Sequence, residues 1–253
     1  MPIDPSAHPS RRDVLQFAGS AVAFVALAAG PLAALAQTPG AAPIKIATIG
    51  AGREGGALGS LFVKAGHPVM FSSRHPEQLK DLVTGLGALA KAGTVAEAVA
   101  FGDVVLLVVP YGAVAEIGKE HGKALAPKAL VLDVSDPIAR RDGEDLVKSV
   151  NEEGGAGVAT QKALPGARIV RGFNAINFAK LPELAHRQGE PVGIPIAGDD
   201  QSALALASRL IKEIGFEPVV VGGLAMGKYL VPGTPLAGEH TPEQIRQAAA
   251  TLK

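Results

Sequence analysis

Three glycines near the start of the chain have the spacing of a phosphate-binding turn. Gly50, Gly52 and Gly55 form the pattern GxGxxG within the stretch IGAGREGG. The first glycine permits a tight turn, and the second lets a phosphate approach the backbone because it has no Cβ. The third lets a helix pack closely on the preceding strand. These residue types predict a site for the pyrophosphate of a dinucleotide.

The segments on either side of the glycines are those that such a site needs. Ile44, Ile46, Thr48 and Ile49 are β-branched, so residues 44–49 predict a buried strand, and residues 68–72 predict a second one. Between them, apolar residues at helical spacing predict a helix that ends at Gly66. A GxGxxG motif is a weak signal alone, but a strand–turn–helix–strand context is what a dinucleotide site requires. The alternative, a glycine-rich turn that binds nothing, is therefore disfavoured.

The end of the second strand indicates which dinucleotide is bound. NAD sites usually place an acidic residue about 20 residues after the first glycine, where it holds the ribose 2′-hydroxyl. This chain instead has Ser72, Ser73 and Arg74 there. Hydroxyl groups and a guanidinium fork suit a 2′-phosphate, which a carboxylate would repel. The sequence predicts NADP(H); the alternative is a solvated turn with an ordinary arginine.

Composition excludes several other kinds of site. The 253 residues are 47% hydrophobic and 19% charged, which suits a sizeable core. The 24 Lys and Arg residues balance 24 Asp and Glu residues, so the basic footprint of a nucleic-acid-binding protein is missing. Cysteine is absent, which excludes disulfides, thiolate catalysis and zinc–sulfur sites. No metal-ligand spacing is found, and Ser135 lies in no GxSxG motif.

The first 36 residues have the pattern of an export signal. Arg11 and Arg12 precede an Ala-rich apolar run over residues 17–36, which ends in Ala-Leu-Ala. A basic region, an apolar region and a small-x-small cleavage site are typical of a secretory signal, and the paired arginines resemble a twin-arginine (Tat) signal. An uncleaved membrane anchor is the less favoured alternative. We predict a periplasmic or secreted protein, with a linker at residues 37–43 and no integral membrane domain after cleavage.

The rest of the chain alternates strand and helix patterns. Residues 103–110 (DVVLLVVP) form the unbroken apolar run of a strand that is buried on both faces. We predict a single Rossmann-like, doubly wound α/β domain over residues 44–224, with a mostly parallel sheet. The polar residues 140–157 are expected to form a surface excursion. Residues 225–253 are expected to be a C-terminal extension, whose Gly/Pro-rich part fits either a dimer contact or a lid.

Ligands of such sheets lie at the carboxyl ends of the strands, so residues there are candidates for chemistry. Tyr111 follows the fourth predicted strand and is a candidate general acid for a carbonyl or imine substrate. Asp133 and Asp136 follow the fifth, and we interpret them as turn or cap residues rather than catalytic acids.

Four stretches in this order and spacing resemble the NADPH-dependent F420 reductase family. They are IGAGREGGALGSLFVKAGHPVMFSSRHPEQL, LLVVPYGAV, VLDVSDP and RIVRGFNAINF, and the resemblance covers roughly residues 44–224. It implies direct hydride transfer between the nicotinamide and the deazaflavin ring of F420, with no side chain needed as acid or base. The resemblance assigns the pyrophosphate to Ala51, Gly52, Arg53 and Glu54, the 2′-phosphate to Ser73 and Arg74, the nicotinamide ribose to Val109 and Pro110, and the hydride-transfer gap to Asn174, Ala175 and Ile176.

We therefore predict an NADP(H)-dependent oxidoreductase whose partner is a small-molecule redox acceptor such as F420 or a flavin. One alternative is an NADP-dependent imine or keto reductase, disfavoured because the chain lacks a long helical C-terminal domain. Another is a non-catalytic dinucleotide-binding protein. A homodimer is compatible with the sequence.

Overall fold

The predicted strands assemble into one eight-stranded sheet with the spatial order β3-β2-β1-β4-β5-β6-β7-β8. The computed structural model describes residues 42–252, so the predicted export signal and most of the linker lie outside the described residues. All neighbouring strands pair in parallel except β6 and β7, which are antiparallel. The strands are β1 (Ile46–Ile49), β2 (Val69–Ser72), β3 (Ala90–Gly93), β4 (Val104–Leu107), β5 (Leu130–Asp133), β6 (Ile169–Arg171), β7 (Gly193–Gly198) and β8 (Glu217–Gly222).

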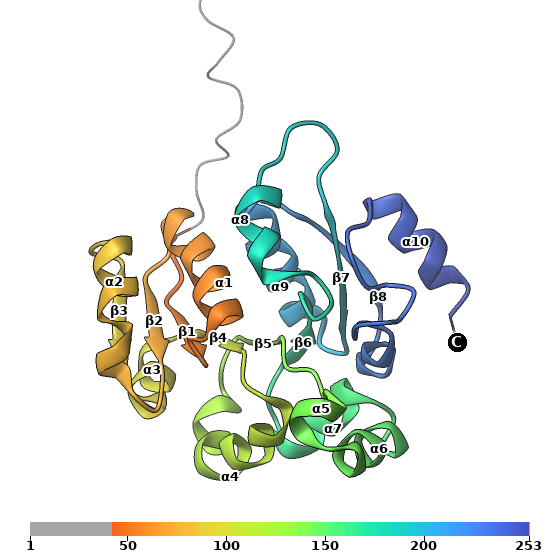
Figure 1. The fold of residues 1–253 in the computed structure, drawn as a ribbon, viewed down its shortest axis with the longest axis horizontal. Helices are drawn as coiled ribbons and strands as arrows, with labels where there is room; N and C mark the ends of the chain where they lie inside the picture. The colour runs from red at the N-terminus through yellow and green to blue at the C-terminus, as the bar shows by residue number, and fades with distance from the viewer. Residues whose placement is uncertain (1–41, 253) are drawn as a thin grey trace, which may run out of the picture. The chain divides into compact units, whose positions relative to one another are not determined.

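Helices connect the strands and cover both faces of the sheet (Figure 1). One layer contains α1 (Arg53–Lys64), α8 (Leu181–Leu184) and α9 (Gln201–Glu213). The opposite layer contains α3 (Val95–Phe101), α4 (Val114–Leu125), α6 (Glu144–Glu152) and α7 (Ala156–Ala163). The remaining elements are η2 (Pro76–Leu79), α2 (Lys80–Leu86), η3 (Tyr111–Ala113), α5 (Ala139–Asp142), η4 (Phe178–Lys180), η5 (Leu224–Tyr229) and α10 (Pro242–Ala250).

The core has two layers because the central strands are buried on both faces. In β4, Val104 and Leu106 belong to the cluster that also contains residues of α1 and α9. Val105 and Leu107 belong to the cluster that contains residues of α3 and α4. Successive residues of a strand point to opposite faces, so a doubly covered strand must be apolar throughout. The predicted doubly wound α/β fold with a mostly parallel sheet is confirmed.

The polar residues 140–157, which were expected to form a surface excursion, fold into helices. Most of them lie in α5, α6 and α7. Most of their charged residues are exposed, whereas Val150 and Ala156 are buried in the core. The apolar stripe was too short to stand out within such a polar segment.

The C-terminal residues belong to the same unit as the sheet. Helix α10 packs on β7 and β8, and Gly193 forms a β-bridge with His240. This helix begins at a capping box formed by Thr241 and Gln244. Within residues 42–252, no helix is both long enough and apolar enough to cross a membrane.

Candidate functional site

The turn after β1 has the geometry that its glycines predict. Gly50 has φ of +96°, and a Cβ there would lie 2.2 Å from the Val108 carbonyl oxygen. A Cβ on Gly55 would lie 2.1 Å from the Gly50 carbonyl oxygen. By contrast, a Cβ on Gly52 would meet no atom within 4 Å. Gly50 and Gly55 are therefore required by the turn itself, whereas Gly52 leaves open space for a ligand.

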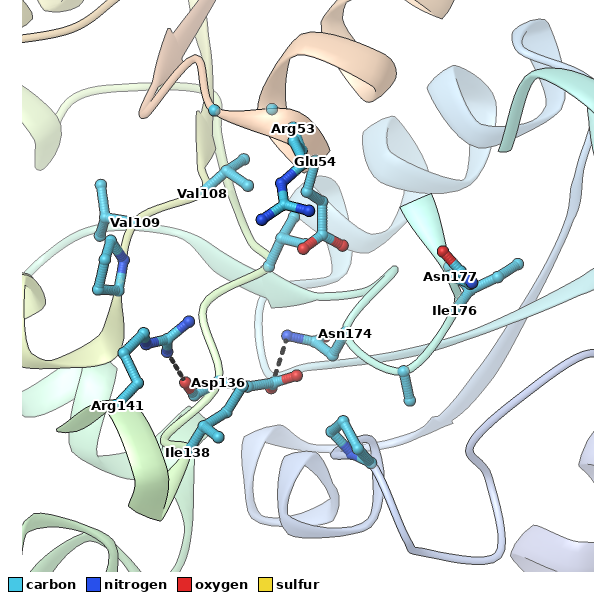
Figure 2. A pocket seen from close by; sticks show the side chains of 16 residues that line it. Arg53, Glu54, Val108, Val109, Asp136, Ile138, Arg141, Asn174, Ile176 and Asn177 are labelled. Atoms are coloured by element: carbon cyan, nitrogen blue, oxygen red, sulfur yellow. Dashed lines mark hydrogen bonds between the residues drawn. The ribbon is translucent and has the colours of Figure 1, made fainter. Parts of the chain in front are cut away.

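A cavity of about 400 Å³ opens where β1, β4, β5 and β6 end (Figure 2). Its lining combines a glycine turn, apolar side chains, two carboxyl groups and two arginines. The lining residues are Gly52, Arg53, Glu54, Gly55, Val108, Val109, Pro110, Val134, Asp136, Ile138, Arg141, Asn174, Ala175, Ile176, Asn177 and Pro232. The structure thus brings together residues from the ends of four strands that the sequence separates by more than a hundred positions.

The start of α1 suits an anion. Gly52 is the N-cap of this helix, and no side chain caps it. The first N–H groups of a helix have no partner within the helix, and with the helix dipole they favour a phosphate. The uncapped helix start and the open face of Gly52 therefore fit the pyrophosphate of NADP(H), which would be held by the backbone of residues 52–55.

The end of β2 lies beside this turn. Ile49 pairs with Ser72, and the Ala51 N–H donates a 2.9 Å hydrogen bond to the Ser72 carbonyl oxygen. Arg74 follows on the exposed surface, and it forms no ion pair with any of residues 42–252. Ser73 is half-buried, and its hydroxyl accepts a 3.1 Å hydrogen bond from the His75 N–H. A guanidinium without a carboxylate partner fits the predicted 2′-phosphate.

The structure contradicts two of the predicted ligands. Ser72 is fully buried, and its hydroxyl donates a 2.9 Å hydrogen bond to the Thr48 carbonyl oxygen inside the sheet, so it is no phosphate ligand. Tyr111 is also buried, and its hydroxyl donates to the Ala156 carbonyl oxygen of α7 at 2.9 Å. Burial raises the pKa of Tyr111 to about 12. Tyr111 is not among the residues that line this cavity, so the structure disfavours it as a general acid.

A buried cation that sequence reasoning missed joins β5 to β6. Arg171 has no exposed surface, and its two Nη atoms lie 2.6 Å from Asp133 Oδ2 and 2.7 Å from Asp136 Oδ1. Asp133 does accept a turn hydrogen bond from the Ser135 N–H at 2.9 Å, as a turn residue should. The interpretation of both acids as turn or cap residues was nevertheless incomplete, because both neutralise Arg171. An arginine inside the apolar run RIVRGF was the available signal.

The segment after β6 presents an amide to the cavity. Phe173 has φ of +63°, a left-handed conformation that only a tightly packed site imposes on a large side chain. The next residue, Asn174, donates hydrogen bonds from Nδ2 to the Asp133 carbonyl oxygen at 3.2 Å and to Asp136 Oδ1 at 3.3 Å. Its Oδ1 is buried without a hydrogen-bond partner. Asn174, Ala175 and Ile176 thus line the same cavity as Gly52.

Two carboxyl groups of the cavity hold their protons unusually tightly. Burial, and then the charge of Asp136, raises the pKa of Glu54 to about 8, with Arg141 opposing. Burial raises the pKa of Asp136 to about 7, although Arg171 opposes this shift. Sequence reasoning had assigned Glu54 only to the pyrophosphate. Nothing in the sequence shows that Glu54 and Asp136, 82 positions apart, face one cavity.

A second cavity of about 500 Å³ adjoins the first and shares Ile138 and Pro232 with it. Its other walls are mainly apolar, and Arg140 and Lys228 are its charged lining residues. The two cavities therefore share part of one wall.

Comparison with known proteins concerns first of all the glycine turn and the strands that follow it. Residues 45–137 match the model of the family described as NADP oxidoreductase, coenzyme F420-dependent. The comparisons support an NADP-dependent oxidoreductase. A glycerol-3-phosphate dehydrogenase [NAD(P)+] of Rhizobium etli is 26% identical over 223 residues, which cover 74% of this chain and 68% of that protein. The metalloreductase STEAP3 of Rattus norvegicus is 28% identical over 200 residues, which cover 77% of this chain but only 37% of that protein.

Solved structures share the fold of this chain. The hypothetical protein SMa0349 of Sinorhizobium meliloti is 28% identical with a TM-score of 0.66, covering 78% of this chain and 95% of that one. A protein assigned as an F420-dependent NADP reductase, from Arthrobacter sp. FB24, is 20% identical with a TM-score of 0.63, covering 73% of this chain and 87% of that one. At that identity the second likeness concerns the fold alone.

Proposed function

We propose that this chain is an NADP(H)-dependent oxidoreductase that exchanges a hydride with a small redox acceptor of the F420 or flavin kind. One observation carries the proposal: the open face of Gly52 and the uncapped start of α1 border a cavity at the ends of β4, β5 and β6. Ligands of doubly wound sheets lie at this edge. The matched NADP oxidoreductase model includes the turn and the strands β1 to β5.

Each part of the site has a role in holding the reactants. NADPH, when bound, supplies a hydride from its nicotinamide. The N–H groups at the start of α1 would hold the pyrophosphate, and Arg74 and Ser73 the 2′-phosphate. Val109 and Pro110 would pack beside the nicotinamide ribose. Ala175 and Ile176 would exclude water from the gap between donor and acceptor, where the reacting atoms need to be about 3–3.5 Å apart.

The adjoining cavity is the proposed place of the acceptor. Its walls are mostly apolar, which suits a flat ring, and Arg140 and Lys228 suit an anionic substituent on that ring. Its contact with the first cavity at Ile138 and Pro232 would place the ring next to the nicotinamide.

We also propose that the protein works outside the cytoplasm, on the basis of the paired arginines before the apolar N-terminal run. The twin-arginine route carries folded proteins, and free NADPH should be scarce outside the cytoplasm. The dinucleotide would therefore be loaded before export and dissociate slowly. Protein purified from the periplasm or medium should retain NADP(H); protein that carries no nucleotide and has no affinity for it would refute this part.

A second candidate, an imine or keto reductase, is favoured by one observation. The two protonatable carboxyl groups of the cavity could supply the proton that an imine or carbonyl needs.

The test is a titration of the purified chain with NADPH and NADH, followed by turnover assays with F420, flavins, quinones, ferric chelates and simple imines. We expect tighter binding of NADPH and reduction of a deazaflavin or flavin. Turnover only of imines would select the second candidate, and binding without any turnover would indicate a non-catalytic protein. A chain that binds neither dinucleotide would contradict the proposal.

A further inference from the structure

We infer that Glu54 is the proton donor of the site, and that the acceptor takes up a hydride together with a proton onto a neighbouring oxygen or nitrogen. This inference rests on the proposed hydride transfer and extends it to a class of acceptor: carbonyls, imines, quinones and flavin-type rings. It differs from the expectation, drawn from the family resemblance, that no side chain need act as an acid.

The position of Glu54 is that of a group aimed at a ligand. It lies in the first turn of α1, and its carboxyl group points into the cavity (Figure 2). Among residues 42–252 it has no hydrogen-bond partner. A half-buried carboxyl group without a hydrogen-bond partner does not stabilise the folded protein. Its hydrogen-bonding capacity is therefore available to a bound molecule.

The charged groups that face Glu54 come from two elements. Arg53 belongs to its own helix turn, and Asp136 and Arg141 come from the segment that follows β5. Behind Asp136 lie the buried Arg171 and Asp133. The lining from β4 and from the segment after β6 carries no charge.

The two acids of the cavity have different environments. Asp136 Oδ1 accepts hydrogen bonds from Arg171 at 2.7 Å and from Asn174 at 3.3 Å, and both favour its ionised form. Glu54 has no such donor, and the negative charge of Asp136 opposes its ionisation. The pKa values of about 8 for Glu54 and about 7 for Asp136 agree with this contrast. A proton shared by the pair is therefore held more strongly by Glu54 than by Asp136, an arrangement typical of an acid and its electrostatic partner.

The proposed step balances in atoms and electrons. A bond to hydrogen forms at the accepting atom, a carbon or a ring nitrogen, with the hydrogen and electron pair of the hydride, while the nicotinamide is oxidised. The π electrons of the acceptor move to an adjacent or conjugated oxygen or nitrogen. The O–H bond of Glu54 then breaks, and its proton bonds to that atom. The resulting carboxylate, close to Asp136, is reprotonated from solvent.

Another role for a protonated Glu54 is to donate a hydrogen bond to the pyrophosphate. The observations favour the acceptor because the groups that influence Glu54, Asp136 and Arg141, lie across the cavity at the end of β5. The two roles separate experimentally. A phosphate ligand contributes to NADPH affinity, whereas a proton donor contributes to turnover.

The first measurement needs no ligand. Thermal unfolding of the full chain would be followed from about pH 5 to about pH 9 for the wild type, Glu54→Gln and a control, Glu116→Gln, whose residue is exposed on α4. A raised pKa means that the folded state keeps a proton that the unfolded chain releases, so wild-type stability should fall as pH rises from about 4.5 to about 8. We expect Glu54→Gln to gain stability relative to the wild type over this range, and Glu116→Gln to show no such trend. A constant difference for Glu54→Gln would overturn the inference.

The second measurement is turnover with an acceptor that the wild type reduces. We expect Glu54→Gln to lower kcat by about 100-fold or more, to remove the decline of kcat above about pH 8, and to leave the NADPH Kd within about twofold. Glu54→Asp, which keeps a carboxyl group, should retain that pH dependence. A Glu54→Gln variant with wild-type kcat and pH profile would overturn the inference while the proposed function stands. Weakened NADPH binding with unchanged kcat would assign Glu54 to the phosphate instead and also overturn it. A wild type without any turnover would refute the proposed function and this inference together.

Discussion

Arg171 Nη2 lies 2.7 Å from Asp136 Oδ1 at the edge of the cavity that borders the glycine turn, and the guanidinium is wholly buried. The other arm of the same guanidinium reaches Asp133, so one cation ties the end of β5 to β6. Removing three charged groups from water is unfavourable, and only their mutual pairing offsets that desolvation. Arg171 therefore acts as a positioning residue, which holds Asp136 and, through it, the electrostatics of Glu54.

Breaking this cluster should destabilise the fold strongly. Arg171→Met leaves Asp133 and Asp136 buried without their cation, and we expect a loss of about 3–5 kcal/mol in the free energy of unfolding. Urea denaturation would measure it. Arg168→Met is a matched control, because Arg168 is exposed and lies 3.6 Å from Asp200; its removal should cost about 0–1 kcal/mol. Equal losses in the two variants would show that the cluster has no special importance.

Two substitutions in the glycine turn should have separate effects, one on NADPH affinity and the other on the stability of the fold. Gly52→Thr adds a side chain on the open, cavity-facing side and supplies a good N-cap residue. We expect its stability to change by no more than about 1 kcal/mol, while its NADPH affinity falls at least about tenfold. Gly55→Ala should instead lose about 1–3 kcal/mol of stability, because its Cβ would press on the Gly50 carbonyl oxygen. Denaturation and fluorescence titration of both variants test this, and normal NADPH binding by Gly52→Thr would place the phosphate elsewhere.

The sheet could be predicted from the sequence because its strands and the helices between them are marked by residues that lie within or beside each element. Burial on both faces makes β4 an unbroken apolar run, and capping residues such as Thr94 mark helix starts. Helices α5 to α7 were missed because their apolar residues are few and separated by charges. The spacing of apolar residues therefore does not predict a short helix that buries only one side.

The site was predictable only in part. The glycine turn can be recognised in the sequence because its backbone conformation and close packing require glycine at Gly50 and Gly55. The direction of a hydroxyl at a strand end is decided by its neighbours in space, which is why Ser72 and Tyr111 turned out to point away from the cavity. The Arg171 cluster and the Glu54–Asp136 pair depend on contacts between residues far apart in the chain. No spacing rule reveals such pairs.

Tyr111→Phe should leave catalysis intact. Its hydroxyl bonds to the Ala156 carbonyl oxygen, and Tyr111 itself lines neither of the two adjoining cavities, so we expect kcat and the NADPH Kd to stay near wild-type values. The lost hydrogen bond should lower stability by about 0.5–1.5 kcal/mol. Steady-state kinetics and urea denaturation check both parts. A large fall in kcat at unchanged stability would restore Tyr111 as a catalytic candidate.

The most direct test of the central claim is the NADPH-to-NADH affinity ratio of Arg74→Glu, measured by titration beside the wild type and Lys80→Glu. Lys80 is exposed like Arg74 and lies beyond the end of β2, so it controls for the loss of a positive charge nearby. The account predicts that Arg74→Glu weakens NADPH at least about tenfold and leaves NADH almost unchanged, because a carboxylate repels the 2′-phosphate. Lys80→Glu should keep the wild-type ratio. An Arg74→Glu variant that still prefers NADPH as the wild type does would contradict the account.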